Sequence, residues 1–220
     1  MSEPLDVRMI TVGPVAENTY IVRAQGTDHA LLVDPGDEPE RLIEAIDELA
    51  VTIDAILITH THFDHVGAVA ALARHTGAPV YCPALERHVL ADINTYMRIT
   101  GFGPFESYDA DEVLSGGEHL ELAGLKLDVH FTPGHSPGHL TYAIPSHGAL
   151  FSGDVLFAGS VGRVDLPGGD WPTLAASIAQ LLDSYPDETR VYAGHMSLTT
   201  LGAERESNPF LAELRAPAAG

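Results

Sequence analysis

The sequence is poor in lysine, in basic residues generally and in long apolar runs. Lys126 is its one lysine, and 31 acidic residues against 11 lysines and arginines give a formal net charge of −20. A protein that binds nucleic acid needs lysine and arginine to displace phosphate counterions, and an anionic membrane surface repels a chain of this charge. We therefore expect neither nucleic acid nor a membrane among its partners.

Cysteine is nearly absent as well. Cys82 is the single cysteine, so the chain cannot form an internal disulfide, and we expect its side chain to be a small buried hydrophobic group. The N-terminus lacks the apolar core of a signal peptide, and no run approaches the ~18 apolar residues of a membrane span. These absences predict a cytoplasmic protein.

The remaining composition is that of a globular protein. Of the 220 residues 45% are hydrophobic, and without a repeat or a linker they predict one domain over 1–220. Apolar runs and their spacing predict two β-sheets flanked by helices, although the segment 84–117 is hard to interpret. The expected strands are 5–12, 18–24, 30–33, 53–58, 79–81, 120–122, 125–131, 140–144, 149–152 and 190–193, and the expected helices are 38–50, 67–75, 85–95, 173–182 and 209–215.

The chain contains 12 histidines, and some of them form a motif. The residues T-H-T-H-F-D-H at 59–65 follow a predicted buried strand directly. In an extended segment residues i and i+2 point the same way, so His60 and His62 can reach one metal ion. Asp64 and His65 lie where the chain turns into the next helix and can face a second ion. Imidazole and carboxylate ligands suit zinc, manganese or iron.

Three further segments place a candidate ligand just past the end of a predicted strand. These ligands are His135 in T-P-G-H-S-P-G-H, Asp154 in S-G-D and His195 in A-G-H. Strand ends that share one sheet edge form such sites, so we predict that these residues complete the metal centre.

Other polar residues have a weaker signal. We expect His139 to have a structural role, either orienting a ligand or capping the next strand. Asp34 precedes Pro-Gly and is interpreted as a turn former that could also support the metal loop. Surface or core positions are expected for the histidines without a ligand-like context, namely His29, His75, His88, His119, His130 and His147.

The ordered set of ligands resembles that of the metallo-β-lactamase superfamily. The resemblance implies an αββα sandwich with a two-metal site at one edge. It implies that one ion binds three histidines, that the other binds an aspartate and two histidines, and that Asp154 bridges them. In that order the ligands are His60, His62, His135; Asp64, His65, His195; and Asp154.

Within the superfamily the chain is most similar to short bacterial glyoxalase II-like hydrolases, of hydroxyacylglutathione hydrolase type. The similarity lies in S-G-D-V-L-F at 152–157, in the Gly-rich segment 159–169 and in 201–211. Long glyoxalase II enzymes contact glutathione through a lysine and two tyrosines, which align here with Arg163, Asp165 and Ser197. These differences weaken the expectation of glutathione as the thiol carrier. β-Lactamases of the commonest type match poorly, since they typically carry cysteine at the position of Asp154.

The resemblance therefore predicts a small-molecule metallohydrolase. Two divalent ions, zinc with iron or manganese as alternatives, would activate a bridging hydroxide that attacks a thioester or an ester. Asp64 would bind one ion and orient the nucleophile, and Arg163 would bind a substrate carboxylate or phosphate unless it forms a structural salt bridge. The alternative activity is a mononuclear-iron persulfide dioxygenase on the same fold. A non-catalytic metal-binding module is the third possibility, and the oligomeric state is left open.

The acidic residues are unevenly distributed. Six of them and no lysine or arginine lie between Glu106 and Glu121. The resemblance places this stretch near the rim of the active site, so we expect a rim that disfavours strongly anionic substrates.

Overall fold

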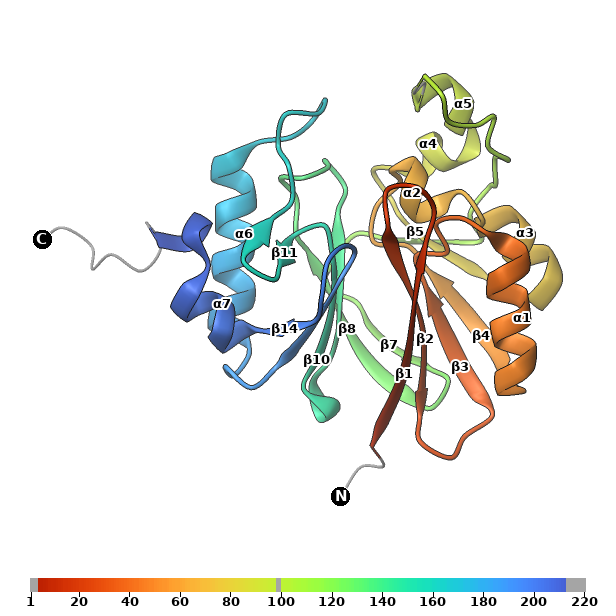
Figure 1. Cartoon of the computed structure of the whole chain (residues 1–220), viewed down its shortest axis with the longest axis horizontal. Coiled ribbons are helices and arrows are strands. Elements are labelled where there is room, and N and C mark those ends of the chain that lie inside the picture. The colour runs from red at the N-terminus through yellow and green to blue at the C-terminus, as the bar shows by residue number, and fades with distance from the viewer. Residues whose placement is uncertain (1–3, 98–99, 213–220) are drawn as a thin grey trace, which may run out of the picture.

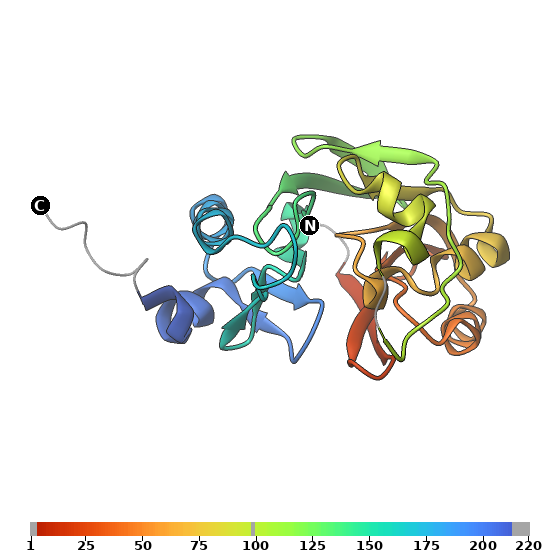
Figure 2. The same ribbon diagram turned by 90° about the horizontal axis from the view of Figure 1, so that it is seen from above.

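Two six-stranded sheets pack face to face, and helices cover the outer face of each (Figures 1 and 2). The computed structural model describes residues 4–97 and 100–212. This arrangement confirms the predicted αββα sandwich. No helix among the described residues is long and apolar enough to cross a membrane.

The first sheet has the order β1-β2-β3-β4-β5-β6. Its first three strands are antiparallel, and β3, β4, β5 and β6 run parallel to one another. Parallel strands need crossover connections, which helices provide here. The strands are β1 Leu5–Val12, β2 Glu17–Ala24, β3 His29–Val33, β4 Thr52–Leu57, β5 Val80–Pro83 and β6 Glu112–Leu114, and the helices are α1 Pro39–Leu49, α2 Phe63–Val66, α3 Val69–Thr76, α4 Arg87–Ala91 and α5 Ile93–Tyr96.

The second sheet has the order β14-β13-β10-β9-β8-β7 and is antiparallel except for the β10–β13 pair. A small hairpin, β11 with β12, follows β10. The strands are β7 His119–Leu122, β8 Leu125–Phe131, β9 Leu140–Ile144, β10 Ala149–Gly153, β11 Leu156–Phe157, β12 Ser160–Val161, β13 Arg190–Ala193 and β14 Thr199–Thr200; the helices are α6 Trp171–Ser184, α7 Leu201–Ser207 and two 3₁₀ turns, η1 Pro145–His147 and η2 Pro209–Leu211.

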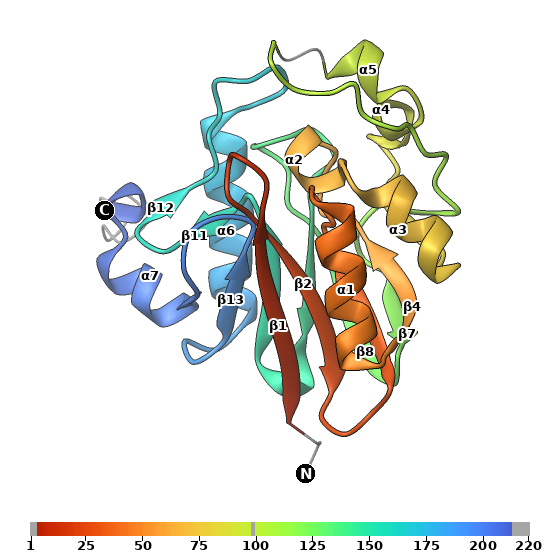
Figure 3. The same ribbon diagram turned by 45° about the vertical axis from the view of Figure 1, so that its right-hand side comes forward.

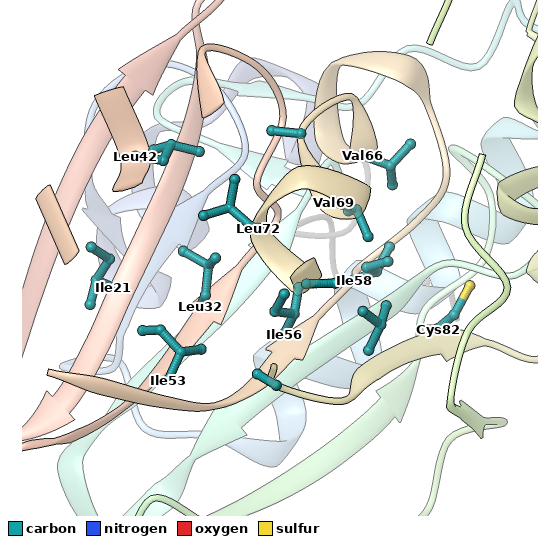
Figure 4. Packing of buried hydrophobic residues seen from close by; sticks show 14 of the residues in the cluster. Ile21, Leu32, Leu42, Ile53, Ile56, Ile58, Val66, Val69, Leu72 and Cys82 are labelled. Atoms are coloured by element: carbon teal, nitrogen blue, oxygen red, sulfur yellow. The ribbon is translucent and has the colours of Figure 1, made fainter. Parts of the chain in front are cut away.

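The helices pack through apolar faces that the sequence spacing predicts. Leu42 of α1 and Leu72 of α3 meet Ile21, Leu32 and Ile56 from the first sheet (Figure 4). On the other side, α6 packs its apolar face against β10 and β13. Asp170 caps α6, because its carboxylate accepts a hydrogen bond from the Thr173 backbone N–H at 2.9 Å. Cys82 is fully buried in the first of these clusters, as expected.

A third apolar cluster lies between the sheets and fixes their separation. Tyr20 packs edge-on against Phe151 and Tyr192, with ring centroids 5.5 and 5.6 Å apart. A hydrogen bond also joins the sheets, since the buried Tyr142 hydroxyl of β9 donates to the Ile58 carbonyl just beyond β4, at 2.8 Å. Ile58 leads directly into the T-H-T-H segment at 59–62, so this bond holds that segment close to the second sheet.

The structure differs from the sequence prediction in three helical regions. The predicted helix 85–95 is divided into α4 and α5, because Asp92 leaves the helical conformation with φ −144° and ψ 56°. The predicted helix 209–215 is wrong at its start, where the 3₁₀ turn Pro209–Leu211 stands; residues 213–215 lie outside the described residues. Helix α7 was not predicted at all.

We expect Tyr142→Phe to lower the free energy of unfolding by about 1–3 kcal/mol, because it leaves the buried Ile58 carbonyl without its tyrosine donor. Urea unfolding of the metal-free protein measures the change. Tyr96→Phe is the matched control, since the Tyr96 side chain is 52% exposed and its change should stay within about 0.5 kcal/mol. Equal stabilities of the two variants would contradict the role of the bond.

Candidate metal centre

The seven predicted ligands meet at one end of the sandwich. His60 and His62 follow β4, and α2 begins immediately afterwards and carries Asp64 and His65. His135 lies in the turn between β8 and β9, Asp154 directly follows β10, and His195 comes two residues after β13. The strands that precede these ligands, β4 in the first sheet and β8, β10 and β13 in the second, all finish at this end of the sandwich, which is why residues far apart in sequence converge there. In Figure 3, α2 lies at this end of the sandwich, beneath α4 and α5.

Three histidines form the first cluster. The Nε2 atom of His135 lies 2.9 Å from Nδ1 of His62 and 3.2 Å from Nε2 of His60. The His60 and His62 nitrogens are 3.1 Å apart. Tetrahedral zinc with three imidazole ligands separates their nitrogens by about 3.3 Å, so the spacing fits one ion at the centre of this triangle.

Asp64, His65 and His195 form the second cluster, and Asp154 lies between the two. The Nε2 atom of His195 is 3.2 Å from Oδ2 of Asp64. The two oxygens of Asp154 lie 3.3 Å from Nε2 of His65 and 3.4 Å from Nε2 of His135. The clusters could therefore hold two ions that share the Asp154 carboxylate.

The outward-facing nitrogen of each histidine determines which tautomer it adopts. His135 Nδ1 donates to the Arg163 carbonyl at 2.8 Å, and His195 Nδ1 donates to the Ala16 carbonyl at 3.2 Å. Those protons leave each Nε2 as a bare lone pair that points into the site. Lone pairs that face carboxylate oxygens at these distances repel each other unless a proton or a metal cation lies between them.

The same logic applies to His60 and His65 through Asp34. The Thr59 hydroxyl gives its proton to Asp34 Oδ2 at 2.6 Å, so it can only accept from His60 Nδ1, 3.1 Å away. His65 Nδ1 donates to Asp34 at 2.9 Å. Asp34 also accepts from the Thr59 N–H at 2.7 Å. Of the two roles open to Asp34, the structure thus shows the supporting one.

Two further observations support metal binding. His65 Nε2 and Asp154 Oδ1 are buried and have no hydrogen-bond partner among the described residues, and an uncompensated buried polar atom is costly. The backbone also leaves room there at Gly194, where a Cβ would lie 2.4 Å from Asp154 Oδ1 and 2.6 Å from His65 Cε1. The residues present therefore fit two bound cations.

The electrostatics of the centre favour the unprotonated forms of His60, His62 and Asp154, and favour positive charge at His65. Burial lowers the pKa of His60 well below the usual histidine value and lowers the pKa of His62 to about 4. Burial alone would raise the pKa of Asp154, but His65 and its neighbours hold it below the usual range. Burial would likewise lower the pKa of His65, yet Asp154 and Asp64 raise it, which shows a field that favours positive charge.

Glu17 belongs to a neighbouring group with Asp34 and His65 that could also bind a cation by distance alone. Its Oε1 atom is 3.8 Å from His65 Nδ1 and has no hydrogen-bond partner among the described residues. Burial raises the pKa of Glu17 well above its usual value, which favours the uncharged acid. His65 Nδ1 already donates to Asp34. The group therefore supports His65 and does not form a third metal site.

His139 has the structural role that the sequence suggested. Its Nε2 accepts from the Asp154 backbone N–H at 3.1 Å, and its Nδ1 lies 3.1 Å from the Thr132 hydroxyl. The ring stacks on His60 with centroids 4.9 Å apart. His139 thus positions two ligands without facing the clusters itself.

Glu86 is the supporting residue that the sequence prediction missed. Its Oε2 accepts from the N–H of Thr61 at 2.7 Å and from the hydroxyl of that residue at 3.0 Å. Its Oε1 accepts from the Ser136 hydroxyl at 2.6 Å and the Gly138 N–H at 2.7 Å. Thr61 lies between two ligands, and Ser136 follows His135. One buried carboxylate therefore links the two loops that carry the three-histidine cluster.

A cavity of about 1050 Å³ opens onto the clusters, and His62, Asp64, His135, Asp154 and His195 line it. Arg163 lines it too. The guanidinium of Arg163 is bound to the Asp165 carboxylate through Nε and Nη2, both at 2.7 Å, which is the salt-bridge alternative. A contact between Arg163 and substrate stays a prediction.

The prediction that the acidic stretch from Glu106 to Glu121 forms the rim of the active site is wrong. None of the six acidic residues from Glu106 to Glu121 is among the described residues that line the cavity. Two of them form ion pairs elsewhere, Glu106 with Arg74 and Asp109 with Arg87. The segment 84–117 instead contributes Glu86 to the site and Tyr96, Met97 and Phe102 to the cavity.

We expect Glu86→Gln to weaken metal binding by about tenfold. The glutamine amide nitrogen cannot accept the hydrogen bonds that one of the two loops donates, so the connection between the loops is lost. A chelator competition titration measures the affinity. Glu121→Gln, a change of an exposed residue of the same type, should leave the affinity unchanged. If both variants bind metal like the unmodified protein, Glu86 does not position the ligands.

Comparisons with known proteins agree with this geometry. The probable metallo-hydrolase YqgX of Bacillus subtilis is 37% identical over 209 residues, covering 93% of this chain and 96% of that protein. The hydroxyacylglutathione hydrolase GloC of Haemophilus influenzae is 34% identical, covering 94% of this chain and 98% of that protein.

Solved structures with the same fold lead to the same family. The BLEG-1 B3 metallo-beta-lactamase has a TM-score of 0.89 at 41% identity, covering 94% of this chain and 100% of that one. A di-iron-bound form of TTHA1623 has a TM-score of 0.83 at 43% identity, with coverages of 93% and 100%. The family model of the metallo-beta-lactamase superfamily matches residues 12–195. The chain belongs to the metallo-β-lactamase superfamily.

Proposed function

We propose that this protein is a dinuclear metallohydrolase that cleaves thioesters of hydroxyacyl-thiol type, or related esters. The observation that carries the proposal is the pair of adjacent ligand clusters that share Asp154 and open into one cavity. The similarity to GloC supports the thioester as the substrate class. Water adds to the thioester carbonyl, the carbon–sulfur bond breaks, and the products are a carboxylic acid and a thiol.

The proposal assigns each ligand to an ion. His60, His62 and His135 would hold one, Asp64, His65 and His195 would hold the other, and Asp154 would serve both. Two divalent ions would supply a hydroxide nucleophile near neutral pH and polarise the carbonyl. Zinc is the first choice, and iron or manganese accept the same ligands; the di-iron form of TTHA1623 is a precedent for iron in that protein.

Asp64 has the position needed to orient the attacking water. It lines the cavity, and its Oδ2 lies 3.2 Å from His195 Nε2. Burial alone would raise the pKa of Asp64, but His65 and His195 hold it below the usual range, so it is present as the carboxylate. A cysteine nucleophile is excluded because Cys82 is buried elsewhere, and burial raises the pKa of its thiol.

The alternative activity is a persulfide dioxygenase with one iron ion. Such a site needs only two histidines and one aspartate, whereas two ligand clusters on either side of Asp154 are present here. Retention of the second cluster favours two ions and a hydrolase. The name of BLEG-1 makes a β-lactam a further substrate to test.

We expect the protein to bind two ions per chain and to hydrolyse S-lactoyl thioesters in proportion to that loading. Chelation should abolish turnover, and Zn²⁺, Fe²⁺ or Mn²⁺ should restore it. The assay pairs metal analysis with turnover of an S-lactoyl thioester, a simple ester, a cephalosporin and a persulfide. If none of the acyl compounds is hydrolysed when both metal sites are filled, the protein is not the proposed hydrolase. Oxygen uptake with the persulfide at one iron ion per chain would establish the dioxygenase.

We expect Asp64→Asn to reduce kcat by about 10²-fold or more at equal metal occupancy, because the amide loses the charge that orients the water. Turnover is normalised to ions per chain, so lost metal and lost orientation are separated. Asp109→Asn removes the same charge outside the cavity and serves as the control. Full kcat in Asp64→Asn would contradict the assigned role.

A further inference from the structure

The cavity beyond the metal clusters is walled by apolar side chains from both halves of the sandwich. Tyr96, Met97 and Phe102 come from the segment after α4, on the side of the first sheet. Val161, Leu166 and Pro167 come from β12 and the loop before α6, on the opposite side. In Figure 3 the region of α4 and α5 and the loop before α6 both lie at the end of the sandwich that carries α2. The cavity therefore has a polar floor of metal ligands and apolar walls.

Several large apolar side chains that line the cavity are exposed to solvent. Tyr96 is 52% exposed, Met196 56% and Val15 39%, and all three line the cavity. Apolar side chains gathered around one concave surface mark a binding site for an apolar ligand, since covering them releases ordered water. Their position next to the reacting centre identifies the ligand as the body of the substrate.

An anionic substrate body has little to bind. Arg163 is the one lysine or arginine among the described residues that line the cavity. Asp165 already accepts from two of its guanidinium nitrogens at 2.7 Å, in the bidentate geometry that a substrate carboxylate would need. A carboxylate ligand would have to displace Asp165, against the field of a chain with net charge −20.

We infer that the substrate is a thioester or ester whose larger group is uncharged and apolar, and not the anionic glutathione thioester. This inference rests on the proposed function and specifies its substrate. The scissile carbonyl lies at the metal ligands, and the apolar group lies between the walls formed by Met97 and Leu166. Each methylene buried there raises kcat/KM by about three- to fourfold, until the cavity is filled.

The test is a set of S-lactoyl thioesters with one acyl group and different thiols: glutathione, N-acetylcysteamine and hexanethiol. We expect kcat/KM for the hexyl thioester to exceed that for the glutathione thioester by at least about tenfold. Binding of the matching non-hydrolysable thioethers, followed by calorimetry on the metal-loaded protein, should show the same order. A glutathione thioester that equals or exceeds the hexyl compound overturns the inference and leaves the hydrolase intact. Absence of turnover on all three, with both ions bound, overturns the hydrolase itself.

Two variants test the walls and the ion pair separately. Leu166→Asn should lower the preference for the hexyl over the glutathione thioester by about fivefold. Asp165→Asn should shift the preference toward glutathione by a similar factor, because it releases Arg163 to bind the carboxylates. Asp109→Asn, which breaks the Arg87 pair outside the cavity, should shift it by less than twofold. Unchanged preferences in the first two variants would show that neither feature selects the substrate.

Discussion

The outward hydrogen bonds of the histidine rings are the interaction on which the site depends. A neutral ring that donates through Nδ1 to a fixed oxygen presents a bare Nε2 to the interior. The acceptors are the Asp34 carboxylate and the carbonyls of Arg163 and Ala16, and the Thr59 hydroxyl serves His60. Because four such lone pairs and two carboxylates meet in one small volume, the centre is incomplete without positive charge. The hydrogen bonds that select the tautomers therefore also create a site that favours a bound cation.

Buried carboxylates divide into two kinds by how well they are satisfied. Glu86 accepts four hydrogen bonds and Asp34 accepts three, so each has donors enough to offset its loss of water. Asp154 is also buried, yet its Oδ1 has no donor among the described residues. The satisfied carboxylates hold loops in place, and the unsatisfied one is left to bind a ligand. The number of donors therefore separates Glu86 and Asp34 from Asp154, whereas Glu17, whose Oε1 also lacks a donor among the described residues, is favoured as the uncharged acid.

The ligands could be predicted from the sequence because they lie in short motifs at strand ends. There, metal-binding residue types occur at positions that lie together at one edge of the fold. T-H-T-H-F-D-H follows a legible apolar strand, so His60 and Asp64 could be placed on the correct edge. Glu86 carries no such signal: it is a single acid in the segment 84–117, and its role comes from Thr61 and Ser136, 25 and 50 residues away. Helix α7 was not predicted for a different reason. It is short, and its one marker is Thr200, whose hydroxyl accepts from the Ala203 N–H at 3.2 Å.

The acidic excess of the chain and the apolar cavity belong to one arrangement. Glu106 and Asp109, from an acid-rich segment, pair with arginines outside the cavity. Inside it, Asp64 and Asp154 would offset two of the four charges that two divalent ions bring. Positive charge therefore remains only beside the ligands, where a carbonyl oxygen gains most from it, while the walls are left apolar. A substrate with its charge confined to the reacting bond matches both regions, and one that is charged at its far end matches neither.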